Sequence, residues 1–215
     1  LELLPQTGLP TPTLHHMTAI LNHMLANTAF GQALDVSNPD DEDAYWNVVH
    51  YKSTPYYAAA FALGALAAGV DEAVAEDCHE LGVLYGEMIQ IHDDLKDSLA
   101  TPANPDWIEG RNPLPILFAS VVEHPEQAHF LALRAAILEG NNLEAAQDIL
   151  VRSGAISYCL DQLLVRFERV QDMLQAVPAA KPELLNELFN ELVEPMKEFL
   201  ETGGMPLPPA LAALG

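Results

Sequence analysis

The sequence predicts an all-α domain, and three observations favour this class. Half of the 215 residues are hydrophobic, which is enough apolar material for one sizeable core. Apolar residues recur at helical spacing along most of the chain, and no stretch alternates apolar and polar residues long enough to indicate a strand. Glycine and proline interrupt this pattern and mark the ends of the expected helices. We therefore expect residues 1–215 to form a single helical domain.

The N-terminal part should contain one long helix and one short helix. Residues 1–12 hold three prolines and predict an extended lead-in, after which a helical pattern runs to about Val36. An acidic turn over residues 37–43 then leads into a short helix expected at about 42–51.

An alanine-rich helix is expected next. Ser53 or Thr54 should cap its N-terminus, Pro55 suits its first turn, and Gly69 should end it. Small residues on all sides of a helix indicate close packing against its neighbours. This helix should therefore lie in the middle of a bundle.

The longest predicted helix covers about 71–97, and Asp71 is its expected N-cap. The segment that follows is rich in proline and asparagine, which predicts a loop of the kind that often serves as a lid or an anion clamp. Further helices are expected at about 114–122, 125–139 (ended by Gly140), 142–151, 154–177 and 181–201, before a proline-rich tail that starts at Gly203.

The charge of the chain excludes several classes of partner. Nine basic and 31 acidic residues give a net charge of −22, which argues against nucleic acid and against an anionic membrane surface. No apolar run is long enough to span a membrane, and the longest, Tyr56–Val70, indicates a buried helix. Cys78 and Cys159 are too few for a disulfide framework, which fits a cytoplasmic protein.

A group of carboxylates ends the longest predicted helix. Asp93 and Asp97 are four residues apart and Asp94 lies three before Asp97, so an α-helix would bring all three to one patch. Like charges repel unless a cation lies between them, and Mg²⁺ prefers oxygen ligands of this kind. The sequence therefore predicts a Mg²⁺ site, with a solvent-exposed acidic helix end as the plain alternative.

One side of the same helix changes character along its length. Gly82, Gly86, Gln90, Asp93 and Asp97 follow one another at steps of four, four, three and four residues, so they share one side. This side is small at one end, carries an amide in the middle and is anionic at the other end. Small residues would leave room beside the helix, and the carboxylates could hold a metal-bound anion. The pattern predicts a site for an apolar molecule with a diphosphate head.

Four short motifs occur in a fixed order along the chain. They are Gly31-Gln32, Lys52-Ser53, Gln90-Ile91-His92-Asp93-Asp94-Leu95-Lys96-Asp97, and Gly110-Arg111 before Leu114-Pro115. This order resembles the C-terminal two-thirds of the trans-isoprenyl diphosphate synthases, or polyprenyl synthetases. The third motif is similar to that family's second aspartate-rich motif, and four motifs in order are far more specific than one.

The resemblance implies an isoprenoid-synthase-type bundle of mostly antiparallel helices around a deep apolar cavity, which the alanine-rich helix would wall. It implies a Mg²⁺-dependent, head-to-tail condensation of isopentenyl diphosphate with an allylic diphosphate, carried out by a homodimer. It also implies residue roles, namely catalysis by Lys52, Gln90 and Asp93, Mg²⁺ binding by Asp93, Asp94 and Asp97, and substrate binding by Gln32, Lys52, Gln90 and Arg111.

The chain also departs from the family pattern. The family carries a first aspartate-rich motif on an earlier helix, and no such motif precedes Gly31 in this chain. We expect either that an N-terminal third is missing from this sequence or that the protein is a divergent relative. Three alternatives stay open: a class I terpene cyclase, a non-catalytic subunit that sets a partner's product length, and a helical interaction protein.

Overall fold

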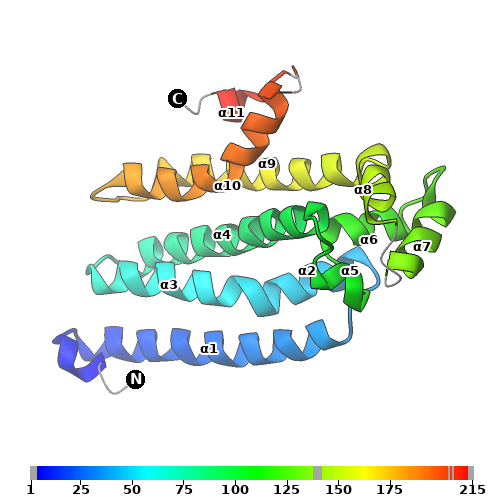
Figure 1. Ribbon diagram of the computed structural model, residues 1–215. Coiled ribbons are helices and arrows are strands. Elements are labelled where there is room, and N and C mark those ends of the chain that lie inside the picture. Colours follow the sequence, from blue (N-terminus) through cyan, green and yellow to red (C-terminus); the bar gives the residue numbers. More distant parts are fainter. Residues whose placement is uncertain (1–3, 138–141, 203, 205, 213–215) are drawn as a thin grey trace.

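The computed structural model describes residues 4–137, 142–202, 204 and 206–212, and every element in these ranges is helical (Figure 1). The predicted all-α class is confirmed. In chain order the elements are the 3-10 helix η1 (Leu4–Thr7), α1 (Thr11–Val36), α2 (Glu42–Val48), the π-helix η2 (Val49–Ser53), α3 (Thr54–Ala67), α4 (Glu72–Leu99), α5 (Pro105–Glu109), α6 (Leu114–Val121), α7 (Gln127–Ala136), α8 (Leu143–Arg152), α9 (Ala155–Leu174), α10 (Pro182–Thr202) and α11 (Pro209–Ala212).

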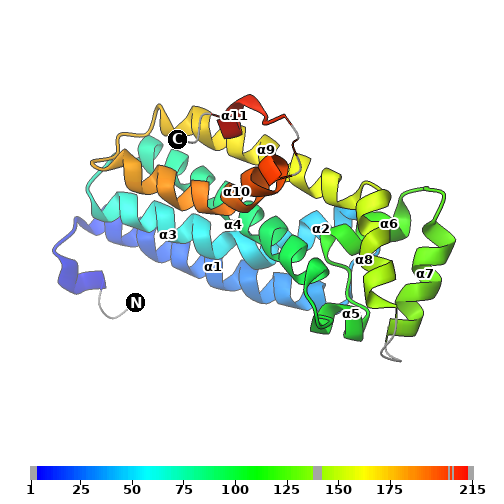
Figure 2. The ribbon, with the colours of Figure 1, turned by 45° about the horizontal axis from the view of Figure 1, so that its top comes forward.

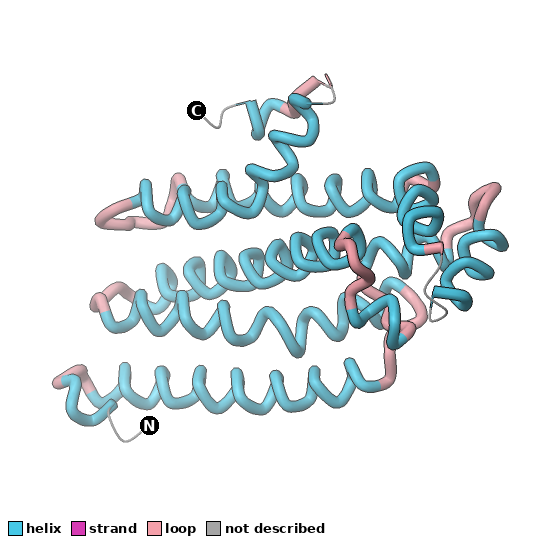
Figure 3. The backbone as a smooth tube through the Cα atoms, in the orientation of Figure 1, coloured by secondary structure: helices cyan, strands magenta, loops and turns pink. Residues whose placement is uncertain are grey.

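The long helices are arranged in layers (Figures 1 and 2). α1 forms one outer layer, α3 and α4 pack together in the middle, and α9 with α10 lies on the opposite side. Loops are short between most of these helices (Figure 3). Because α4 contacts both α3 and α9, the helix that carries the acidic motif runs through the middle of the bundle.

The second and third predicted helices form one continuous helix. The π-helix Val49–Ser53 joins α2 directly to α3. Ser53 has helical backbone angles and makes no side-chain capping bond, while the Thr54 hydroxyl donates back to the His50 carbonyl at 2.7 Å. The predicted helix cap at Ser53 or Thr54 is therefore wrong, because a π-turn takes up the extra residue without breaking the helix.

Two glycines of α4 lie directly against α3. A Cβ at Gly82 would lie 2.5 Å from the Tyr57 carbonyl oxygen, and a Cβ at Gly86 would lie 2.8 Å from the Thr54 Cα. The expectation that these glycines leave room for a ligand is wrong, because the α3 backbone fills that space. Their small size instead allows the two helices to pack closely.

The alanines of α3 do line a cavity, of about 330 Å³, which lies between α1, α3 and α4. Its α3 residues include Ala58, Ala59 and Ala62, and four histidines also line it, namely His16, His23, His50 and His79. This cavity shares no lining residue with the polar cavity described below.

The predicted start of α4 is confirmed. Gly69 ends the preceding turn with a φ of 82°, and the Asp71 carboxylate accepts a hydrogen bond from the Val74 N–H at 2.9 Å. The helix ends at Leu99, two residues beyond the predicted end.

The segment after α4 folds back onto that helix. The short α5 lies within the predicted loop, where the Asn104 side chain accepts from the Asp106 N–H at 2.9 Å and Gly110 ends the helix with a φ of 68°. The buried Trp107 indole donates to a carbonyl in the last turn of α4 at 3.0 Å. These contacts hold Arg111 beside the acidic motif.

The remaining predicted helices are present as α6 to α10. The end of the helix expected at 125–139, its stop at Gly140, and Gly203 lie outside the described residues. The lead-in was expected to be extended, but it contains the helical turn η1, and the proline-rich tail contains the short helix α11. None of the described helices is both long enough and apolar enough to cross a membrane.

Candidate active site

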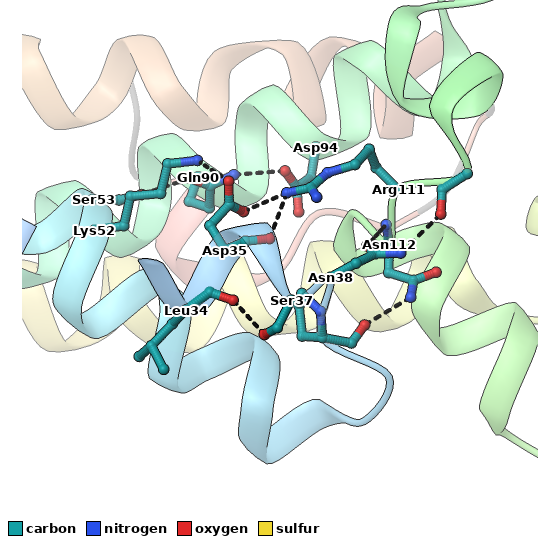
Figure 4. Close-up of polar contacts among 12 residues, drawn as sticks. Leu34, Asp35, Ser37, Asn38, Lys52, Ser53, Gln90, Asp94, Arg111 and Asn112 are labelled. Carbon is teal, nitrogen blue, oxygen red and sulfur yellow. Dashed lines mark hydrogen bonds and ion pairs between the residues drawn. The ribbon is translucent and has the colours of Figure 1, made fainter. Parts of the chain in front are cut away.

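A polar cavity of about 220 Å³ lies between the end of α1, the π-helix, the second half of α4 and the segment after α5 (Figure 4). It gathers side chains from parts of the chain that are distant in sequence. Four of the predicted site residues line it, and two further carboxylates join them. These side chains are Lys52, Gln90, Asp94, Arg111, Asp35 and Asp106.

A close approach between α1 and the π-helix determines the position of the last turn of α1. Gly31 is buried, and a Cβ there would lie 2.3 Å from the Lys52 backbone nitrogen. Only glycine allows the two backbones to come this close. Asp35 follows one helical turn later on the same side of α1, which places its carboxylate beside Lys52.

Asp35 forms ion pairs with two cations from different segments. The Lys52 Nζ lies 2.7 Å from Asp35 Oδ2, and the Arg111 Nη2 lies 2.8 Å from Asp35 Oδ1. The same Arg111 nitrogen also donates to the Asp35 backbone carbonyl at 2.8 Å. Both cations therefore meet at one carboxylate on the edge of the cavity.

Hydrogen bonds of two asparagines connect the segment that carries Arg111 to the turn after α1. The Asn38 amide donates to the Gly110 carbonyl at 3.0 Å, and the Asn112 amide donates to the Pro39 carbonyl at 2.7 Å. In return, the Asn112 N–H donates to the Asn38 Oδ1 at 3.1 Å. Arg111 lies between these contacts, so its backbone is fixed on both sides.

The Asp94 carboxylate is buried and accepts three hydrogen bonds. Tyr45 donates its hydroxyl at 2.8 Å, Leu114 donates its backbone N–H at 2.7 Å, and Gln90 donates its amide at 2.7 Å. Burial raises the pKa of Asp94 to about 6, and these three donors limit the rise. The Gln90 amide is fixed from its other side, since the Ser53 hydroxyl donates to its oxygen at 2.7 Å.

Asp93 and Asp97 face different surroundings from Asp94. The Asp93 side chain is 59% exposed and lies 3.4 Å from the His92 ring nitrogen. Asp97 is half-buried and lies near Asp106. Burial and the neighbouring charge of Asp97 raise the pKa of Asp106, while Arg111 lowers it.

The expected patch of three carboxylates is therefore not present. The Asp94 side chain points into the core, and its oxygens accept hydrogen bonds from donors on three helices. These hydrogen bonds occupy the positions at which a metal ion would bind. Within the described residues, no three His, Cys, Asp or Glu side chains come close enough together to hold a metal ion. Sequence spacing alone overestimated the patch, because helix positions one apart point about 100° away from each other.

Gln32 lies on the exposed side of α1 and does not line the polar cavity. Sequence reasoning missed Asp35, Asp106 and Tyr45. The position of Asp35, four residues after Gly31 on one helix face, could have indicated it. Nothing local in the sequence indicates Asp106 or Tyr45, because their neighbours come from distant segments.

Comparisons with known proteins identify the family of this chain. The family model described as polyprenyl synthetase matches residues 2–150. A geranylfarnesyl diphosphate synthase of Aeropyrum pernix is 29% identical over 191 residues, which cover 83% of this chain and 59% of that protein.

Solved structures give the same result for the fold. A polyprenyl synthase from Caulobacter crescentus, complexed with calcium and isoprenyl diphosphate, is 27% identical with a TM-score of 0.74, over 89% of this chain and 61% of that one. A geranylgeranyl pyrophosphate synthetase from Pyrococcus horikoshii reaches 0.77 at 19% identity, over 90% of this chain and 62% of that one.

The chain thus spans about three-fifths of the length of these three relatives. The family model, however, covers well over half of the 215 residues of this chain, and its range contains every residue that lines the polar cavity. This chain belongs to the polyprenyl synthetase family.

Proposed function

We propose that this chain forms part of a prenyltransferase that condenses isopentenyl diphosphate with an allylic diphosphate, head to tail. One observation carries the proposal: Lys52, Gln90 and Arg111 converge from three segments into one cavity beside an aspartate-rich helix end. Family membership supports the same reaction class, since the Aeropyrum relative is named as a geranylfarnesyl diphosphate synthase.

In such a reaction the allylic C–O bond breaks and pyrophosphate leaves. The double bond of isopentenyl diphosphate attacks the allylic cation, and the new cation then loses a proton to re-form a double bond. Negative charge grows on the leaving oxygens and must be stabilised. Lys52 and Arg111 supply two positive charges for this purpose, and a guanidinium can contact two phosphate oxygens at once. We assign Gln90 and the exposed Gln32 to further contacts with the substrates.

The carboxylates fit a divalent cation such as Mg²⁺. Asp93 is well exposed, and Asp97 lies close enough to Asp106 that the two negative charges affect each other. Hard cations bind oxygen ligands of this type. We assign the metal to Asp93 and Asp97, where it would supply positive charge to the diphosphate when bound. Asp94 instead accepts a hydrogen bond from the Gln90 amide and so holds that side chain in place.

The test is the binding of pyrophosphate in the presence of Mg²⁺, measured by calorimetry. Lys52→Met and Arg111→Met each remove one positive charge and should weaken binding about tenfold or more. Arg152→Met is the matched control. Arg152 forms an ion pair with Glu126 at the surface, and neither residue lines the cavity. Unchanged affinity in both cavity variants would contradict the assignment.

A second candidate function is a non-catalytic subunit of a heteromeric synthase. The described residues hold no ready set of three metal ligands, and this observation favours it. Such a subunit would bind a catalytic partner and change the partner's product length without turnover of its own.

We also propose that two copies of the chain associate through α1. This helix of 26 residues carries a single ionised side chain, Asp35, in a chain with a net charge of −22. Only Met17 and Gly31 of α1 are buried, while Leu25, Phe30 and Val36 are exposed. A surface with little charge lowers the electrostatic cost of bringing two acidic copies together.

The α1 interface can be tested by light scattering coupled to size exclusion. A Leu25→Glu/Phe30→Glu variant should lower the measured mass from dimer to monomer, and Val151→Glu, an exposed apolar control on α8, should not.

We further propose a cytoplasmic location and a single domain, and the two free thiols Cys78 and Cys159 support a reducing compartment.

A further inference from the structure

The contact between Asp35 and its two cations has no counterpart in the residue roles considered so far. Asp35 comes from the end of α1, Lys52 from the π-helix, and Arg111 from the segment after α5 (Figure 4). The Asp35 side chain is 19% exposed, against 35% for Lys52 and 25% for Arg111. Ion pairs at this depth are screened less by solvent than surface pairs are.

The Asp35 contacts leave both cations with free hydrogen-bond donors. A lysine ammonium has three N–H donors and a guanidinium has five. Asp35 takes up one nitrogen of each side chain, Lys52 Nζ and Arg111 Nη2. The rest of each cation remains able to bind an oxyanion in the cavity. Two positive charges and one negative charge leave this group with a net charge of +1.

Without the Asp35 carboxylate, Lys52 would lose its ion-pair partner, and Arg111 would keep its bond to the Asp35 backbone carbonyl but lose its ion pair. Long charged side chains lose rotamer entropy when they are fixed in one geometry. A carboxylate that already holds them removes most of that cost from ligand binding. The neighbouring backbone makes the arrangement rigid, because Gly31 allows α1 to touch the π-helix one turn before Asp35.

We propose that Asp35 is a positioning residue that holds Lys52 and Arg111 in place for a diphosphate. This inference rests on the proposed function, in which the same two cations contact that group. An internal competitor, which would occupy the cations and exclude the ligand, is the opposite role. The two roles predict opposite signs for the effect of removing its charge.

The test measures pyrophosphate binding with Mg²⁺ by calorimetry, using the 215-residue chain. Asp35→Asn should weaken binding about tenfold if Asp35 positions the cations, and should tighten it if Asp35 competes. Asp35→Glu keeps the charge but moves it outward by one methylene, so it should also weaken binding. Asp40→Asn, an exposed carboxylate in the turn before α2, is the charge-matched control and should change affinity less than about twofold.

A double-mutant cycle separates this role from a general structural one. In a Lys52→Met/Arg111→Met background, Asp35→Asn should have no further effect on affinity, because the residues through which it acts are gone. Circular dichroism melts check that each variant folds, and Asp35→Glu carries the test if Asp35→Asn does not.

The outcomes are distinct. Wild-type binding with unchanged or tighter binding in Asp35→Asn and Asp35→Glu would overturn the positioning role alone. No binding of pyrophosphate by the wild type would overturn the proposed function and this inference together.

Discussion

The Asp94 carboxylate accepts a hydrogen bond from the Leu114 backbone N–H at 2.7 Å, which ties the acidic end of α4 to the first turn of α6. The Tyr45 hydroxyl donates to the same carboxylate oxygen at 2.8 Å and brings in α2. A carboxylate from a motif that suggests metal binding therefore holds three helices together. Its removal should affect folding before it affects chemistry.

The stability of the metal-free protein should fall as the pH rises through about 6. The pKa of Asp94 is raised from 3.8 to about 6 in the folded protein, so folding favours the protonated form. The contribution of Asp94 to stability is full below about pH 4 and is lost as the pH passes the folded pKa. A shift of about two pKa units corresponds to roughly 3 kcal/mol. Urea unfolding with a chelator, from pH 4 to 8, measures the change.

Asp94→Asn should remove this component of the pH dependence and remain folded at pH 8. The amide oxygen can accept from Leu114 and Tyr45, while its NH₂ group requires the Gln90 amide to turn over. Asp94→Ala, by contrast, leaves buried donors unpaired and should cost roughly 2–4 kcal/mol. Asp77→Asn on the exposed side of α4 is the control. An Asp94→Asn variant with an unaltered pH profile would refute this explanation.

The glycine contacts predict opposite effects at different sites. Gly31→Ala and Gly82→Ala would each place a Cβ within 2.5 Å of another helix's backbone, and should destabilise the protein by more than about 3 kcal/mol. Gly64→Ala has open space around it in α3 and should stabilise the protein by roughly 0.5–1 kcal/mol. Chemical denaturation of the three variants measures this, and equal effects would show that packing does not decide the outcome.

Mg²⁺ and pyrophosphate should stabilise the protein together more than the sum of their separate effects. A ligand that binds only the folded state raises the melting temperature by mass action. The gain should disappear in an Asp93→Asn/Asp97→Asn variant and persist in Asp77→Asn. If the double variant keeps the gain, the metal assignment fails.

The 215-residue chain should bind diphosphate without condensing substrates by itself. Asp93 and Asp97 offer carboxylates on one side of a diphosphate, and the described residues provide no second acidic cluster to face them. We predict that a further helical segment supplies that cluster. Condensation assays with isopentenyl diphosphate and allylic substrates, run on this chain and on a longer form, test this. Turnover by the chain alone would contradict the prediction, and inactivity of both forms would favour the non-catalytic subunit.

Local sequence signals predicted the helices well and the site only in part. Asp71 and Gly69 mark the start of α4 correctly because an N-cap and a left-handed glycine depend on neighbouring residues alone. The burial of Asp94 was not predictable in this way, since its partners Tyr45 and Leu114 are 49 and 20 residues away. The ion pairs of Asp35 were not predictable either, although its spacing from Gly31 marks the residue, because Lys52 and Arg111 come from other segments of the bundle.

The π-helix between α2 and α3 lets one additional residue enter the helix without turning its two ends relative to each other. A π-turn holds about one residue more than an α-turn, so deletion of one residue within Val49–Ser53 would give ordinary α-helical winding while α2 and α3 keep nearly the same orientation. The residues of the turn itself would be redistributed around the helix axis, and Lys52, which is one of them, would lose its place beside Gly31 and Asp35. A length change in this one turn would therefore move a single cation of the cavity while the bundle around it keeps its arrangement.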